Sequence, residues 1–187
     1  MVDEAQTDTS GEARENNHEP VDEVADLLAE RFDATAVLSH GQAVVHVARE
    51  QWHDVAEHLR DHERFTQCVD VTAVDHLADA TRSPLPGGVA PDRFEVVANF
   101  LSHSRNRRVR VIAQVPAEDA EIASITDLYP GVDFAEREVY DLMGITFSGH
   151  ADLTRILMPD DWVGFPLRKD DPSARVPVTF KEDPSPR

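Results

Sequence analysis

Three acidic residues close together in the sequence could carry out acid–base chemistry. Glu136, Glu138 and Asp141 lie within one short stretch, and neighbouring carboxyl groups can act as general acid and general base. A stand-alone hydrolase is therefore one hypothesis. We favour a structural interpretation, because Arg137 stands four residues before Asp141 and can pair with it on a helix. A single short helix with internal partners also offers no cleft for a substrate.

A second set of residues could bind a metal ion. Asp54, His58 and His62 recur every four residues, so they would share one face of a helix. Two histidines at this spacing bind zinc in the HExxH pattern, but the glutamate that serves as general base in that pattern is missing here. We therefore interpret the three residues as a solvent-exposed helix face and keep a metal-binding module as the alternative.

His150 is the third candidate for chemistry. An imidazole can carry a proton near neutral pH, and His150 stands shortly before Asp152 and Arg155. Because no partner base stands nearby, we expect His150 to orient the chain through a hydrogen bond instead. Nucleotide chemistry has no support, since neither GxGxxG nor GxxxxGK occurs in the sequence.

A helix must position most of these side chains. It is predicted to begin at Asp133, which can accept backbone N–H bonds as the N-cap, with Glu136 at the capping-box position. Gly144 is expected to end it, because glycine readily adopts the left-handed conformation found there. One face of this helix is apolar, with Ala135, Val139, Leu142 and Met143. The other side is polar, with Glu136, Arg137, Tyr140 and Asp141.

The chain after Gly144 is predicted to be an extended docking arm, residues 145–175. Its prolines exclude long helices: Pro159, Pro166 and Pro172. Its cations suit carboxylates on another chain: Arg155, Arg168 and Lys169. Its large apolar side chains are typical of interface hot spots: Leu157, Met158, Trp162 and Phe165. We expect the arm to be mobile in the free protein and ordered in a groove of a partner.

The same stretch carries a family signature. Glu136 to Asp170 contains EREVYDLMGI, followed by F, GH, DL, RILMPDDW, G and PLRKD. This pattern closely resembles the 30-kilodalton subunit, also called the C subunit, of respiratory complex I, the proton-pumping NADH:quinone oxidoreductase. The upstream stretch Ser124–Pro130 is also similar to that family, and the resemblance covers roughly residues 20–175.

The resemblance implies a non-catalytic assembly subunit in the peripheral arm of complex I. Electron transfer to quinone, coupled to proton translocation, would belong to the complex, with the iron–sulfur cluster and the quinone on partner subunits and neither cofactor nor metal on this chain. The partners would be the large quinone-site subunit and the subunit with the terminal iron–sulfur cluster, at the cytoplasmic face of the cell membrane. The alternative is the equivalent subunit of a related complex that uses reduced deazaflavin or ferredoxin. The residues expected at the interfaces are Glu136, Arg137, Glu138, Tyr140, Asp141, Gly144, Gly149, His150, Arg155, Trp162, Arg168 and Lys169.

The charge balance narrows the possible partners. The 187 residues carry a formal net charge of −18, with 36 acidic and 18 basic residues. Such a surface argues against nucleic acid and against direct docking on anionic lipid. Only Lys169 and Lys181 are lysines. This depletion favours a protein adapted to a salty cytoplasm, where ions screen self-repulsion, over an ordinary acidic protein.

Cysteine content and hydropathy favour a soluble intracellular protein. Cys68 is the single cysteine, so the chain can form no internal disulfide and no thiolate cluster. Its apolar neighbours predict that it is buried. No apolar run reaches the roughly 18 residues of a membrane span, and the N-terminus lacks the pattern of a signal peptide.

The remaining pattern predicts a two-layer α+β fold in which helices cover one face of a mixed sheet of about five strands. Helices are predicted over residues 20–31, 50–64 and 116–124, and strands over 35–39, 42–47, 66–74, 94–102 and 107–115. The strand over 66–74 is β-rich and apolar and is expected to be buried. Residues 77–92 are predicted to be a loop. The expected organisation is a disordered acidic tail (1–19), the α/β domain (20–144), the docking arm (145–175) and a flexible tail (176–187).

Overall fold

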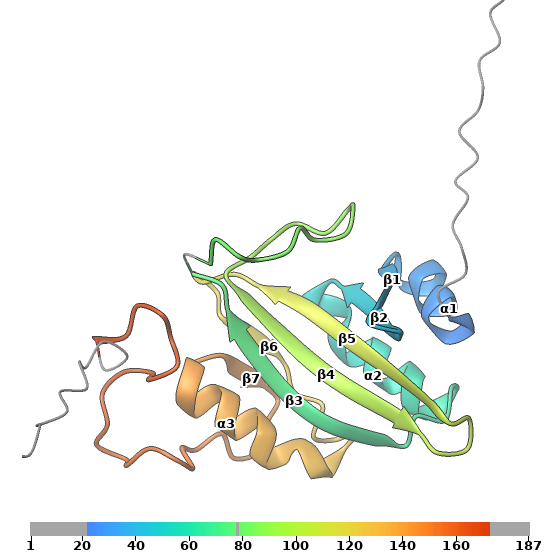
Figure 1. Cartoon of the computed structure of the whole chain (residues 1–187). Helices are drawn as coiled ribbons and strands as arrows, with labels where there is room; N and C mark the ends of the chain where they lie inside the picture. Colours follow the sequence, from blue (N-terminus) through green and yellow to red (C-terminus); the bar gives the residue numbers. More distant parts are fainter. Residues whose placement is uncertain (1–21, 78, 173–187) are drawn as a thin grey trace, which may run out of the picture.

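A five-stranded mixed sheet forms the centre of the computed structural model, which describes residues 22–77 and 79–172. The strand order is β1-β2-β5-β4-β3, and all neighbours are antiparallel except the parallel pair β2 and β5 (Figure 1). The strands are Thr35–Ser39 (β1), Gln42–Val47 (β2), Gln67–Asp75 (β3), Phe94–Ser102 (β4) and Arg107–Val115 (β5).

Alternation along the strands gives the sheet one core face and one open face. On β4, Phe94, Val96 and Phe100 are buried, whereas Val97 and Asn99 are only partly buried. Strand β5 repeats the alternation from residue 109 onward. Because the two strands pair in register, the half-exposed positions of both fall on the same side of the sheet.

Two helices cover the core face of the sheet: α2 lies behind it in Figure 1, and α1 lies beside β1 and β2. Helix α1 (Glu23–Phe32) begins after Asp22, whose carboxylate accepts the N–H of Val24 at 3.0 Å. Helix α2 (Trp52–Asp61) follows a 3-10 turn, η1 (Arg49–Gln51). Both helices bury apolar residues on the side that faces the sheet, among them Leu28 of α1 and Val55 of α2, so the fold has the predicted two layers.

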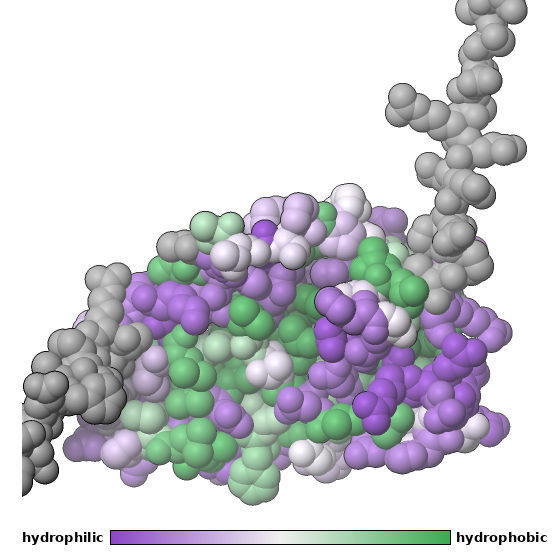
Figure 2. Space-filling view, viewed as in Figure 1, coloured by the Kyte–Doolittle hydropathy of each residue, from purple (hydrophilic) through white to green (hydrophobic). Residues whose placement is uncertain are grey.

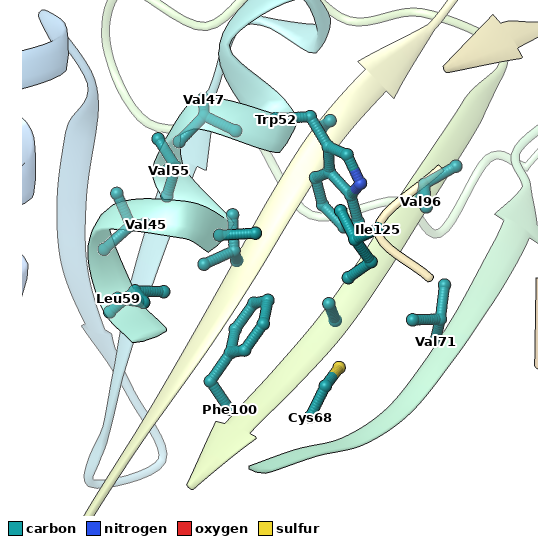
Figure 3. Close-up of a cluster of buried hydrophobic side chains, with 14 of the residues drawn as sticks. Val45, Val47, Trp52, Val55, Leu59, Cys68, Val71, Val96, Phe100 and Ile125 are labelled. Atoms are coloured by element: carbon teal, nitrogen blue, oxygen red, sulfur yellow. The ribbon is translucent and has the colours of Figure 1, made fainter. Parts of the chain in front are cut away.

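The core lies between α2 and the sheet. Figure 3 shows Trp52 and Leu59 of α2 on the same side of the sheet as Phe100 of β4, and all three are at most 1% exposed. Burying a large apolar side chain contributes about 1.5–3 kcal/mol to folding. Cys68 of β3 joins this cluster and is buried, as predicted.

A second, smaller sheet and a third helix complete the domain. Strands β6 (Glu121–Ala123) and β7 (Thr146–Ser148) pair in parallel. A 3-10 turn, η2 (Pro130–Val132), leads directly into α3 (Asp133–Met143), which packs beside the edge strand β3 (Figure 1). The chain after β7 then runs along α3 without regular secondary structure up to residue 172.

The α+β class and the five-stranded mixed sheet are confirmed, and β1, β2, β4 and β5 have the predicted bounds. Two predictions are wrong. Residues 116–124 form no helix, because Ile122 is buried in β6 by pairing with a strand far along the chain. Strand β3 is not fully buried, since it lies at an edge and alternates between buried and exposed residues.

The predicted boundary at residue 144 is also wrong. Ile145 and Phe147 are 0% and 2% exposed and belong to the hydrophobic core, because β7 pairs with β6 rather than leaving the domain. The α/β domain therefore includes residues 145–148. The predicted tails, 1–19 and 176–187, lie outside the described residues, as do the predicted helix start at Pro20 and the last three residues of the predicted arm.

Candidate functional site

Asp141 of α3 holds the start of the C-terminal segment, residues 149–172, and is fully buried. Its Oδ2 accepts three consecutive backbone N–H groups, those of Ile156 at 3.0 Å, Leu157 at 2.7 Å and Met158 at 2.9 Å. Its Oδ1 accepts a hydrogen bond from Arg155 at 3.0 Å. Burial alone would raise the pKa of Asp141, but the three N–H groups and the nearby guanidinium outweigh it and lower the pKa.

Arg155 joins two parts of this segment. Its Nη1 contacts Asp141, while its Nη2 donates to the carbonyl oxygen of Gly164 at 3.1 Å. Its guanidinium also lies 5.4 Å from the centre of the Phe165 ring, a geometry that suits a cation–π contact. Arg155 therefore closes the loop between residues 155 and 165 on the surface of α3.

Gly144 forms a second attachment point, at the end of α3. Its φ of 68° is the left-handed conformation that the sequence predicted for this glycine. The ring of Phe165 packs so closely that a Cβ on Gly144 would lie 2.5 Å from its Cε2 atom. Arg168 caps the same helix end, donating to the carbonyl oxygens of Met143 at 2.5 Å and Gly144 at 3.1 Å. Such capping satisfies carbonyls that a helix end leaves without partners.

Asp75, at the end of β3, forms the third attachment point. Its side chain is fully buried and accepts two hydrogen bonds from Arg93, at 3.0 and 2.8 Å, and one from the backbone N–H of Lys169 at 2.9 Å. Burial opposes ionisation, but Arg93 and the backbone N–H groups of Lys169 and Leu77 lower the pKa of Asp75 to about 2. Arg93 also binds Asp170, so one arginine connects the sheet to the end of the segment.

Glu136 fastens α3 to the loop before it. It is completely buried, and its carboxylate accepts hydrogen bonds from Ser124 Oγ at 2.6 Å and from the backbone N–H of Ile125 at 2.9 Å. Burial raises its pKa. The predicted capping box is wrong, because η2 runs straight into α3 and Pro130 accepts the N–H of Asp133.

His150 is placed as an orienting residue. Its ring is fully buried, its Nδ1 accepts the backbone N–H of Asp152 at 3.1 Å, and its Nε2 lies 3.3 Å from Asp133 Oδ1. The predicted pairing of Arg137 with Asp141 is wrong. Arg137 instead binds Thr154, at its carbonyl oxygen and its hydroxyl, while the buried carboxylate of Asp141 is taken up by Arg155 and backbone N–H groups of the segment.

The two alternative sites do not assemble. Glu136 and Asp141 are bound to separate groups, and Glu138 is exposed. Of the predicted metal ligands, His58 is buried in the domain. Across the described ranges, 22–77 and 79–172, no three His, Cys, Asp or Glu side chains gather as a metal site would require.

Large apolar side chains face outward around the attached segment. Trp162, predicted as an interface residue, is 38% exposed, and Leu157 is 59% exposed. Of the other predicted interface residues, Gly149 and Lys169 are exposed, while Tyr140 is partly buried. Sequence reasoning did not assign Asp75 and Arg93, because they precede the arm by many residues and no local pattern links them to it.

This geometry defines a two-layer α+β domain whose buried carboxylates hold an irregular C-terminal segment with an apolar outer surface. Residues 45–176 match the family described as "Respiratory-chain NADH dehydrogenase, 30 Kd subunit". The chain belongs to this family.

Individual relatives agree with that assignment. The chain is 42% identical over 169 residues to the C subunit of NADH-quinone oxidoreductase from Salinispora tropica, covering 86% of this chain but 64% of the relative. It is 42% identical over 149 residues to the same subunit from Geobacter sulfurreducens, covering 78% and 85%. The chain therefore spans about two thirds of the Salinispora relative and most of the Geobacter one.

Solved structures share the fold. A trypsin-resistant fragment (1-134) of Nqo5 superposes with a TM-score of 0.58 at 31% identity, covering 67% of this chain and 93% of the fragment. A chain of an archaeal membrane-bound sulfane sulfur reductase superposes with a TM-score of 0.52 at 21% identity, which shows likeness of fold. Within the part of the chain that the structure describes, no helix has the length and hydropathy needed to cross a bilayer.

Proposed function

We propose that this chain is a non-catalytic assembly subunit of a respiratory NADH:quinone oxidoreductase, and that the C-terminal segment docks it to its neighbours. The observation that carries the proposal is the outward placement of Leu157, Trp162 and Val163, which are 59%, 38% and 93% exposed, on a segment fixed from below by buried ion pairs. Family membership and relatives named as the C subunit of NADH-quinone oxidoreductase support it.

The order of the segment before association favours a docking role over a purely internal one. Ordering one backbone residue costs about 1–2 kcal/mol, and a segment held by Asp141, Gly144 and Asp75 bears that cost before any partner arrives. A pre-ordered surface with large apolar groups binds more tightly, because less entropy is lost on association. Exposed apolar groups of this size are typical of an interaction site.

The partners in this proposal are the large quinone-site subunit and the subunit with the terminal iron–sulfur cluster. Electron transfer to quinone and proton translocation are then reactions of the complex, and the cofactors reside on the partners. In the proposal the subunit sits at the cytoplasmic face of the cell membrane as a peripheral component. The internal fixation of Glu136 and Asp141, each bound to its own partners, supports a role without catalysis on this chain.

The electron donor is a separate question. A chain of a sulfane sulfur reductase complex has the same fold, so the fold also occurs in another respiratory complex, and a related complex that uses reduced deazaflavin or ferredoxin stays the alternative. Purification of the tagged chain from native membranes tests the proposal, with identification of every co-purifying chain. Quinone-site and iron–sulfur subunits should be present, and flavin-bearing NADH-oxidising subunits should accompany them.

Single substitutions test whether the C-terminal segment contributes to assembly of the complex. Trp162→Ala should weaken docking by about 2 kcal/mol if Trp162 is a hot spot. Leu27→Ala is the matched control, since Leu27 on α1 has the same 38% exposure but lies away from the segment. Equal recovery of the complex from both variants would contradict docking through this surface.

A further inference from the structure

The open face of the sheet contains a groove that the C-terminal segment does not use. Helix α2 lies behind the sheet in Figure 1, and the loop between β3 and β4 runs above the upper ends of the strands. Between this loop and the strands lies a cavity of about 630 Å³. From β1, β2, β5 and the loop, its lining includes Val37, Val44, Leu85 and Ile112. Figure 2 shows hydrophobic residues among hydrophilic ones on the side of the molecule that faces the viewer.

We propose that this groove is a second docking surface, which takes an acidic segment of a partner chain with an apolar side chain beside its carboxylate. The inference rests on the proposed function only in assuming that the protein is a subunit of a complex. The groove is separate from the C-terminal segment and lies on the face of the sheet opposite the core.

Charge is the first argument for an acidic segment. Arg110 lines the groove, and its guanidinium donates only to neutral groups, Asn99 Oδ1 at 3.3 Å and Gln42 Oε1 at 3.1 Å. Its neighbour Arg108 is exposed and makes no ion pair or hydrogen bond with any described residue. By contrast, Arg155 lies 3.0 Å from a carboxylate of its own chain.

This contrast matters because the chain has twice as many acidic as basic residues, 36 against 18. Arginine is also suited to bidentate binding of a carboxylate. The pair Arg108 and Arg110 on the open face is therefore complementary to carboxylates that another chain supplies.

An unpaired polar atom at the groove is the second argument. His46 of β2 lines the groove and is 8% exposed, yet its Nδ1 has no hydrogen-bond partner. Burial lowers its pKa, and a neutral imidazole offers one donor and one acceptor. A buried polar atom without a partner destabilises the structure that holds it. A peptide backbone lying in the groove could supply the missing hydrogen bond.

The two acidic residues that line the groove, Asp79 and Glu95, do not repel an acidic ligand, because their charges have partners within the chain. Glu95 is bound by Arg82 at 2.6 Å and lies 3.2 Å from His76. Asp79, the other acidic residue lining the groove, is held by Thr81 and lies 3.3 Å from His76. Residues that follow β3 therefore engage both carboxylates, and among the described residues that line the groove Arg110 is the charged group left to attract an incoming segment.

A photo-crosslinker tests the proposal in intact cells. With p-benzoylphenylalanine at Leu85, irradiation followed by denaturing purification and peptide mapping should give an adduct with one other polypeptide, at a segment that contains aspartate or glutamate next to an apolar residue. The crosslinker at Leu27 on α1 should not label that segment. Because the adduct is read before any complex is purified, the result does not depend on the docking of the C-terminal segment.

Arginine variants complete the test. Arg110→Gln should lower the yield of the adduct at least fivefold, and Arg64→Gln, at an arginine without an ion pair to the described residues, should leave it unchanged. Arg108→Gln breaks no contact of the fold and should lower the yield at least twofold. An adduct with lipid, with a second copy of the chain or with a segment lacking carboxylates would overturn the inference, as would no adduct or yields indifferent to both arginines.

Discussion

Asp141 Oδ1 and Arg155 Nη1 lie 3.0 Å apart, and the carboxylate of this pair is completely buried beneath the segment that carries the arginine. The same carboxylate gathers three backbone N–H groups on its other oxygen. One side chain of α3 thus sets the path of four successive residues. The fixed position of the exposed apolar side chains Leu157, Trp162 and Val163 therefore depends on the charge of Asp141.

Asp141→Asn should therefore loosen the segment. Removing one partner of a buried ion pair costs about 3–5 kcal/mol, because Arg155 and the N–H groups keep their desolvation cost without a compensating charge. Urea unfolding should show this loss, and limited proteolysis should cut first between residues 149 and 172. Glu138→Gln, at an exposed position of the same helix, should change neither the stability to urea nor the site of first cleavage. If Asp141→Asn behaves like Glu138→Gln, Asp141 does not anchor the segment.

Acid should release the end of the segment at Asp75. Its folded pKa of about 2 lies below its ordinary value of 3.8, so its contribution is complete above about pH 4 and is lost as the pH falls through about 2. The shift corresponds to about 2 kcal/mol. Asp75→Asn should thus be much less stable than the parent at pH 6, and the difference should shrink as the pH approaches 2. A difference independent of pH would contradict the ion pair with Arg93.

Gly144 should be sensitive for two separable reasons. A non-glycine residue in left-handed backbone costs about 1–2 kcal/mol, and its Cβ would also displace the ring of Phe165. Gly41→Ala isolates the first effect, since Gly41 has a φ of 76° but open space around it. Gly144→Ala should lose more stability than Gly41→Ala and should expose the segment to protease. Equal losses would mean that the contact between Gly144 and Phe165 contributes nothing.

Salt should stabilise the protein. With a formal net charge of −18, self-repulsion weakens as ions screen it, over about 10 Å at 0.1 M salt and about 3 Å at 1 M. The melting temperature should rise between low and molar potassium chloride. Adaptation to a salty cytoplasm stays a prediction until this is measured, and a flat or falling melting temperature would remove it.

Local patterns predicted much of this fold. The hairpins and Gly144 were accessible because alternation, turn residues and a helix stop lie close together in the sequence. The burial and the hydrogen-bond partners of Glu136 and Asp141 could not be predicted, because no local pattern shows whether a carboxylate on a helix faces solvent or is buried against backbone N–H groups. Phe147 shows the same limit, since its burial depends on the pairing of β7 with β6, which are distant in sequence.

The central claim is that residues 149–172 dock the domain into a larger complex. A chain that ends at Ser148 retains the core residues Ile145 and Phe147, so it should remain folded, although it loses the partners of Asp75 and Asp141. The decisive measurement compares its recovery in the complex purified from native membranes with that of the full chain. The account predicts a folded domain that is absent from the complex, together with loss of quinone reduction. A shortened chain recovered in the complex at the level of the full one would contradict it.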